Sequence, residues 1–176
     1  MIDFLRRLIT TFETSNIPYM LSGSVAMSIY TGPRFTRDYD FIVHLKPGDV
    51  NHFAEQFKEG YYCDKDAIFD ATRNEGMFNI IDFKSGYKAD FIILKNNPYR
   101  KTEFERRKKV KFLEMMIDIV SPEDLLLSKI IWIQELQSGV QMEDIKILSE
   151  HKGLDWGYIN YWVKELNLKT FNLLLN

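Results

Sequence analysis

The sequence has few of the features that mark a disulfide-bonded, secreted or membrane-spanning protein. Cys63 is the one cysteine among 176 residues, which excludes an internal disulfide framework and suits a reducing compartment. No apolar run approaches the roughly 18 residues that a transmembrane helix needs. The first ten residues include an acid and lack a small-residue cleavage site, so no signal peptide is expected. These absences predict a cytoplasmic protein with no membrane partner.

The net charge is also small, and this limits the partners that electrostatics alone could attract. The 23 Lys and Arg residues nearly balance 25 Asp and Glu residues, for a net charge of −2. Binding to nucleic acid would therefore need a local basic patch rather than a global field. A hydrophobic content of 45% is ample for a packed core, and the length fits one domain or a domain with a small appendage.

The most informative stretch runs from Tyr19 to Val43. A short apolar run precedes Gly23 and Ser24, and a helix-like segment then leads to a Gly-Pro turn. Asp38 and Asp40 follow, two residues apart at the start of another apolar run. Residues two apart in a strand point to the same side of a sheet, so both carboxylates share one face. Because burying unpaired carboxylates is costly, a divalent cation between them is the simplest explanation.

Hydrophobic periodicity and turn residues predict the other elements. Helices are expected over residues 2–14, 24–30, 49–58, 121–137, 142–151 and 155–166, with Asp49 and Ser121 as N-caps and Gly139 ending the fourth. Residues 64–74 fit either a short helix or an irregular segment. Strands are expected over residues 19–22, 39–44, 77–83 and 87–94, followed by short strands within 110–120.

A third acid is expected on the hairpin formed by residues 77–83 and 87–94. Asp90 interrupts the second run, and Asp82 stands near the end of the first. A carboxylate within such a strand needs a reason. Asp90 is the preferred candidate, because the apolar run after it is longer and is typical of a more central strand. Asp82 remains the alternative.

Two basic features have both a structural and a functional interpretation. Lys129 falls inside the apolar arc of the helix that begins near Ser121. Its aliphatic side chain could extend along the apolar surface until the ammonium reaches solvent, or the ammonium could face phosphate in a cleft. The segment between Arg100 and Lys111 is very basic. It fits a solvated helix end and an exposed strand edge, or a phosphate-binding patch for RNA.

The central stretch resembles the nucleotidyltransferase superfamily, which has the polymerase-beta-like fold. The likeness is to G-S-x-A followed by R-x-T-x-D-x-D, and the residues that carry it are Gly23, Ser24, Ala26, Arg34, Thr36, Asp38 and Asp40. Within the superfamily it looks most like the AbiEii-type toxin nucleotidyltransferases and their uncharacterised relatives. The resemblance implies an α+β fold with a mixed sheet flanked by helices. It also implies a catalytic core over residues 1–120 and a C-terminal helical segment over residues 121–176 that packs on the core.

The same resemblance implies the site residues and the cofactor. Asp38, Asp40 and Asp90 are expected to be the catalytic acids and the ligands of Mg²⁺ or Mn²⁺. The residues expected to bind the nucleotide, or to orient those that do, are Gly23, Ser24, Arg34, Lys129 and Asp144.

The implied activity is transfer of a nucleoside monophosphate from a nucleoside triphosphate to an acceptor, with release of pyrophosphate. RNA or tRNA is the favoured acceptor, bound through the segment from Arg100 to Lys111, as for a toxin with a cognate antitoxin. Two alternatives stay open. One is a small-molecule acceptor of the aminoglycoside type, and the other is a nucleotide-binding module without turnover.

Overall fold

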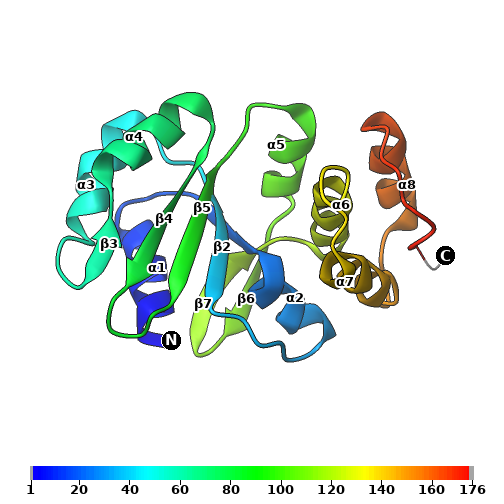
Figure 1. The fold of residues 1–176 in the computed structure, drawn as a ribbon, viewed down its shortest axis with the longest axis horizontal. Coiled ribbons are helices and arrows are strands. Elements are labelled where there is room, and N and C mark those ends of the chain that lie inside the picture. The colour runs from blue at the N-terminus through cyan, green and yellow to red at the C-terminus, as the bar shows by residue number, and fades with distance from the viewer. Residues whose placement is uncertain (1, 175–176) are drawn as a thin grey trace.

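The computed structural model describes residues 2–174, which form one mixed sheet with helices on both faces (Figure 1). The helices are α1 (Ile2–Thr14), α2 (Gly23–Thr31), α3 (Val50–Glu55), α4 (Lys65–Asn74), α5 (Pro98–Glu105), α6 (Pro122–Trp132), α7 (Gly139–Ser149) and α8 (Trp156–Glu165), with a 3₁₀ turn η1 (Pro47–Asp49). The strands are β1 (Tyr19–Ser22), β2 (Asp38–Val43), β3 (Tyr61–Cys63), β4 (Met77–Asp82), β5 (Lys88–Ile93), β6 (Lys108–Phe112) and β7 (Met115–Ile119). None of the described helices is long and apolar enough to cross a bilayer.

The sheet has the strand order β3-β4-β5-β2-β1-β7-β6. β2 lies at its centre, antiparallel to β1 and parallel to β5. β4 and β5 form the predicted antiparallel hairpin. The predicted α+β fold with a mixed sheet flanked by helices is therefore confirmed.

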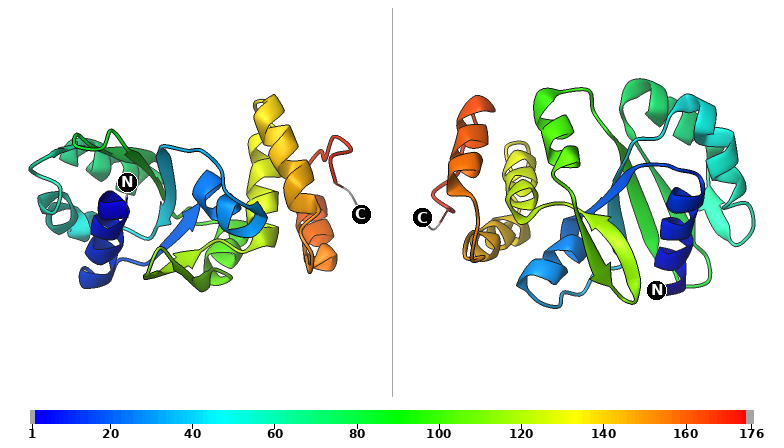
Figure 2. Two further views of the ribbon diagram at one scale, coloured as in Figure 1. Left: turned by 90° about the horizontal axis from the view of Figure 1, so that it is seen from below. Right: turned by 180° about the vertical axis from the view of Figure 1, so that it is seen from behind.

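Successive side chains of β2 point to opposite faces of the sheet, and each face carries its own hydrophobic core. Tyr39, Phe41 and Val43 point to the face that packs against α1, α3 and α4. Ile42 points to the opposite face, where α2 and the C-terminal helices α6, α7 and α8 gather (Figure 2). Asp40 is two residues before Ile42, so it lies on this second face. Because the second core includes residues of both the sheet and α6–α8, the C-terminal helices pack on the sheet. The division at residue 120 stays a prediction.

The C-terminal helices differ in their limits from the predicted ones. α6 begins as predicted, with Ser121 as N-cap accepting a hydrogen bond from the Asp124 amide. It ends at Trp132 rather than at residue 137, and the chain continues in turns. In that turn the Gln134 side chain exchanges hydrogen bonds with the backbone of Lys169. Gly139, expected to end this helix, is the first residue of α7.

The region between β2 and β4 is the least well predicted part of the chain. The helix expected over residues 49–58 is α3, which covers only Val50–Glu55. Asp49, the expected N-cap, belongs to η1, and its side chain makes no capping hydrogen bond to any residue that the structure describes. The edge strand β3 was not predicted, because three residues are too few to establish an alternating pattern. The segment left open between helix and irregular structure is the regular helix α4, which is capped by the Asp64 side chain.

A buried carboxylate holds the C-terminal helices to one another. Asp124 is fully buried and accepts hydrogen bonds from Ser121 Oγ at 2.6 Å, Tyr158 Oη at 2.6 Å and Arg106 Nε at 3.0 Å. The Arg106 guanidinium also lies 3.8 Å from the centre of the Tyr158 ring. These contacts join the end of α5 to α6 and α8, and so fix the helix that carries Lys129.

Replacement of this carboxylate is expected to destabilise the fold. Asp124→Asn should lower the free energy of unfolding by about 2–4 kcal/mol, because it removes the charge that Arg106 pairs with in a buried setting. Asp118→Asn is the control, since its pairs with Arg107 and Lys109 are long, at 3.9 and 3.7 Å, and should cost under about 1 kcal/mol. Urea denaturation measures both, and equally small losses would contradict the role given to Asp124.

Candidate active site

Three acids from two strands lie side by side on the second face of the sheet. β2 and β5 run parallel and in register, with Asp40 paired to Asp90 across the two strands. Asp38 is two residues before Asp40 and shares its face. Neighbouring strands are about 4.8 Å apart. The sheet therefore brings Asp90 next to the Asp38–Asp40 pair, although they are distant in the sequence.

The electrostatics of this cluster favour an added cation. Burial raises the pKa of the Asp40 carboxyl above its usual value, and the nearby charges of Asp90 and Asp38 raise it further. The positive charges of Lys129 and Lys88 lower the pKa of Asp40 in part. A raised carboxyl pKa means that its negative charge is incompletely balanced, so a positive ion at this position would be stabilised.

Gly23 lies directly against Asp40. Its φ is +63°, and a Cβ added at this position would fall 1.8 Å from Asp40 Oδ2, so both the backbone and the carboxylate require glycine. Gly23 is also the first residue of α2. The side chain of the N-cap, Ser22, makes no capping hydrogen bond to any residue that the structure describes. The N–H groups at the start of this nine-residue helix therefore remain available to an anion beside the acids.

Lys129 reaches the site from α6 and is held by α7. Its side chain is 8% exposed, and its ammonium donates to Asp144 Oδ2 at 2.8 Å and to Gln141 Oε1 at 3.0 Å. Asp144 is itself buried and also forms an ion pair with Arg34, which lies in the loop between α2 and β2. Asp144 therefore positions two cationic side chains expected at the site, those of Lys129 and Arg34. The pair with Asp144 holds Arg34 against α7.

Part of this group lines a cleft of about 480 Å³ between the sheet and α6. Gly23, Ser24, Asp40 and Lys129 form its polar end. The rest of its lining includes Met77 of β4, Ile92 of β5 and Leu94 just after β5. It also includes Arg100 of α5, Ser128 and Trp132 of α6, and Glu135 just after α6. The cleft thus combines the polar end with a wall of mixed apolar, aromatic and charged side chains.

The donor set fits a divalent ion that shares its coordination with a substrate. Among residues 2–174, no three His, Cys, Asp or Glu side chains are grouped as a ready-made metal site. Mg²⁺, however, is usually held by one or two carboxylates together with substrate phosphates rather than by a cage made only of protein. Asp38 and Asp40 offer hard oxygen ligands on one face, beside the uncapped start of α2.

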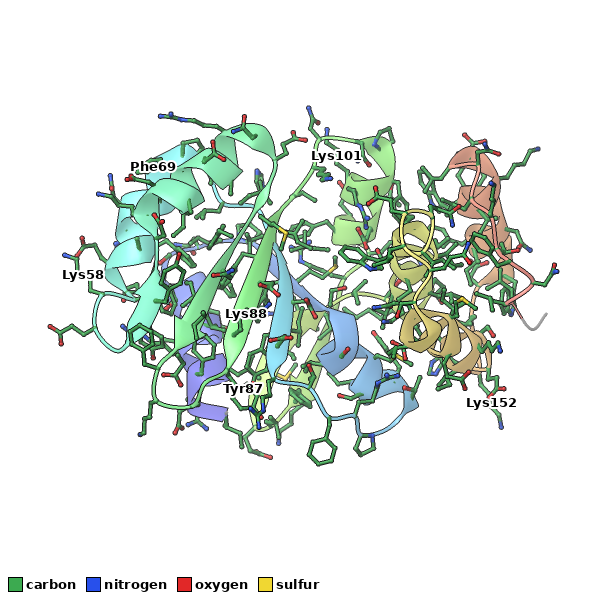
Figure 3. The ribbon with its side chains drawn as sticks, viewed as in Figure 1. Lys58, Phe69, Tyr87, Lys88, Lys101 and Lys152 are labelled. Carbon is green, nitrogen blue, oxygen red and sulfur yellow. The ribbon has the colours of Figure 1, made fainter. Side chains whose placement is uncertain are left out.

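Lys88 is a site residue that sequence analysis missed. Its ammonium lies 2.7 Å from Asp90 Oδ2, at the start of β5 (Figure 3). The hydrogen bond with Asp90 is the largest cause of a raised pKa for this lysine. The spacing contained the signal, since Lys88 is two residues before Asp90 and so shares its face.

The alternative third acid, Asp82, lies elsewhere. Asn79, not Asp82, is the β4 partner of Asp90, and Asp82 is three residues further on and on the opposite face. Its carboxylate accepts hydrogen bonds from the backbone amides of Lys84 and Ser85 in the β4–β5 turn. Asp82 is therefore a turn residue.

Most charges of the basic segment from Arg100 to Lys111 are paired with acids within the chain. The pairs that use its charges are Arg100–Glu103, Arg106–Glu123, Arg106–Asp124, Arg107–Asp118, Lys109–Asp118 and Lys111–Glu114. The segment forms α5 and the edge strand β6, which matches its structural interpretation. The expected RNA-binding surface has no support in this arrangement.

Comparisons with known proteins identify the fold. No family model matches the chain, and no curated protein sequence matches it either. Solved structures do match. The solution structure of the antibiotic-resistance factor ANT(2'')-Ia aligns with a TM-score of 0.63 at 10% identity, over 94% of this chain and 90% of that one.

Two other structures agree. A lincosamide antibiotic adenylyltransferase, LnuA, aligns with a TM-score of 0.53 at 16% identity, over 83% of this chain and 94% of that one. An antigenic nucleotidyltransferase-like protein from Paracoccidioides brasiliensis aligns with a TM-score of 0.55 at 15% identity, over 91% of this chain and 86% of that one. Identities this low establish only the fold, and the chain has the fold of these nucleotidyltransferases.

Proposed function

We propose that the protein is a metal-dependent nucleotidyltransferase that moves a nucleoside monophosphate from a nucleoside triphosphate to a hydroxyl group of a small molecule. The observation that carries this proposal is the register of β2 and β5. It sets Asp40 beside Asp90, on the face where Gly23 begins α2. This arrangement joins carboxylates, an anion-binding helix start and a buried lysine at one end of a cleft.

Each group has a role that follows from its surroundings. Asp38 and Asp40 would hold the Mg²⁺ or Mn²⁺ ion together with the nucleotide phosphates. A divalent ion held there supplies positive charge to the phosphate oxygens on which negative charge develops. The first N–H groups of α2, at Gly23 and Ser24, donate hydrogen bonds to the triphosphate. Asp90, next to Asp40, would complete the metal site on the acceptor side and accept the proton of the acceptor hydroxyl.

Lys129 adds a fixed positive charge to the same end of the cleft. Its ammonium has a third donor hydrogen beyond the two that bind Asp144 and Gln141, and this hydrogen can reach a phosphate oxygen. Asp144 orients Lys129 and keeps Arg34 beside it. A cation positioned in advance stabilises developing charge without reorganisation during the reaction.

A small-molecule acceptor agrees with the structure better than RNA does. The cleft of about 480 Å³ falls within the range of about 300–1,000 Å³ that is usual for small-molecule sites. ANT(2'')-Ia has been solved with adenylyl-2''-tobramycin and LnuA with lincomycin, both small molecules. RNA was the favoured acceptor on sequence grounds, but the arginines of the basic segment are engaged in ion pairs within the chain. The finer resemblance to AbiEii-type toxins, and a cognate antitoxin, stay predictions.

A transfer screen tests this function. The protein is incubated with each of the four α-³²P-labelled nucleoside triphosphates and Mg²⁺ or Mn²⁺, and is offered hydroxylated small molecules, total RNA or protein. Label is expected on a small molecule that carries amino and hydroxyl groups. Label on RNA would overturn the acceptor class. Tight nucleotide binding without any transfer would instead indicate a module without turnover.

Mutation can distinguish acids that take part in the transfer from acids that serve only the structure. Asp40→Asn is expected to lower the transfer rate by at least about 100-fold, because it removes a charged ligand at the reacting phosphate. Asp82→Asn is the matched control, because Asp82 is an even more buried acid of the same sheet but binds the amides of the turn. It should keep transfer within about threefold of the wild type. Single-turnover rates measure both, and similar losses would contradict the assignment.

The close packing of Gly23 against Asp40 gives a second test. Gly23→Ala would push a methyl group into the Asp40 carboxylate, so transfer should fall by at least about 30-fold. Gly86→Ala is the matched control, since its φ of +69° is similar but nothing lies within 4 Å of the added Cβ. Both should lose about 1–2 kcal/mol of stability through backbone strain, measured by thermal unfolding. Equal transfer rates in the two variants would count against the site.

A further inference from the structure

Lys88 occupies a position at the acid cluster that the proposed reaction does not use. Lys88 and Asp90 lie two residues apart on β5, and their β2 partners are Asp38 and Asp40. The four side chains thus form a square array on one face, three negative and one positive. The positive member lies 2.7 Å from Asp90 Oδ2. Figure 3 shows Lys88 where β5 borders β2.

The ion pair engages the carboxylate that a metal ion would otherwise reach. The Asp90 side chain is only 14% exposed, so few directions remain for another cation to approach it. An ammonium at hydrogen-bond distance also repels a divalent ion at the same oxygen. The Lys88 side chain is 36% exposed, so its ammonium can turn into solvent without being buried elsewhere.

The second lysine at the cluster differs from Lys88 in this respect. Lys129 is buried and is held on α6 by Asp144 and Gln141 of α7. Lys129 is therefore a fixed charge, whereas Lys88 is held at the cluster by the acid itself. Only Lys88 has both the contact with an acid of the cluster and the exposure that would let it exchange with an ion.

We infer that Lys88 competes with a divalent metal ion for Asp90, an inference that rests on the proposed function. In the nucleotide-free protein, Lys88 neutralises Asp90 and weakens metal binding at the cluster. When a nucleotide brings its phosphates and its ion, the ammonium leaves Asp90, which then becomes available to the acceptor side of the site. Lys88 is thus a positioning residue that couples metal binding to nucleotide binding.

The experiment measures metal binding directly. Free Mn²⁺ is quantified by electron paramagnetic resonance during titration of the full chain without nucleotide. Lys88→Met is expected to lower the Kd for Mn²⁺ by about two- to fivefold, the range of a partly exposed ion pair. Lys101→Met is the matched control, because Lys101 is an exposed lysine on α5, away from the cluster in Figure 3, and its Kd should equal that of the wild type.

Two further measurements show whether the effect passes through Asp90 and depends on nucleotide. In an Asp90→Asn background, Lys88→Met should no longer tighten Mn²⁺ binding. With a non-hydrolysable nucleoside triphosphate present, the difference between the wild type and Lys88→Met should shrink. Circular dichroism and thermal unfolding verify that each variant is folded.

The outcomes separate the inference from the function on which it rests. If Lys88→Met binds Mn²⁺ as the wild type does, or more weakly, while both proteins transfer nucleotides, the inference is overturned and the function stands. If neither protein binds Mn²⁺ with nucleotide present and neither transfers, the proposed function fails and the inference fails with it. Tighter binding that depends on Asp90 supports the inference.

Discussion

The parallel, in-register pairing of β2 with β5 is the constraint on which the rest of the site depends. It places Asp40 beside Asp90 on one face, while Phe41 and Phe91, one residue later on each strand, stack in the core on the other face with ring centres 5.8 Å apart. A slip of one residue in either strand would turn its acid into the aromatic core and its phenylalanine toward the face of the cleft. The hydrophobic core therefore fixes the register, and the register in turn assembles the carboxylates. Stability and the geometry of the proposed chemistry depend on the same strand pair.

The C-terminal helices contribute to the site through charge as well as packing. Lys129 approaches the acids because Asp124 and Ser121 anchor the start of α6, and Asp144 of α7 then fixes its ammonium. Asp144 also holds Arg34, which precedes β2. One buried carboxylate thus links the last part of the chain to the loop that leads into Asp38. Even though residues 121–174 carry none of the acids of the cluster, they set the electrostatic balance around it.

Local sequence was enough to predict the parts of the site that depend on short-range rules. Glycine before a helix and acids two apart in a strand have direct physical meanings, and Gly23, Asp38 and Asp40 were found in this way. Asp90 was preferred over Asp82 from the length of an apolar run, and the structure brings Asp90, not Asp82, to the cluster. What could not be predicted depends on partners that are distant in the sequence. The partner of Arg106 is Asp124 and that of the Gln134 side chain is Lys169, and neither pairing can be recognised from a local pattern. Lys88 was missed although it is two residues before Asp90, because a lysine at the start of a strand is ordinary until that acid is known to belong to a cluster.

The central claim is that nucleotide and metal bind where β2, β5 and the start of α2 meet. A crystal structure of the protein with Mn²⁺ and a non-hydrolysable nucleoside triphosphate tests it most directly, because the anomalous signal of manganese locates the ion without ambiguity. The account predicts an anomalous peak beside Asp38 and Asp40, with phosphate oxygens near the Gly23 and Ser24 amides and the Lys129 ammonium. A nucleotide bound elsewhere, or phosphates in this cleft with no metal at the acids, would contradict it.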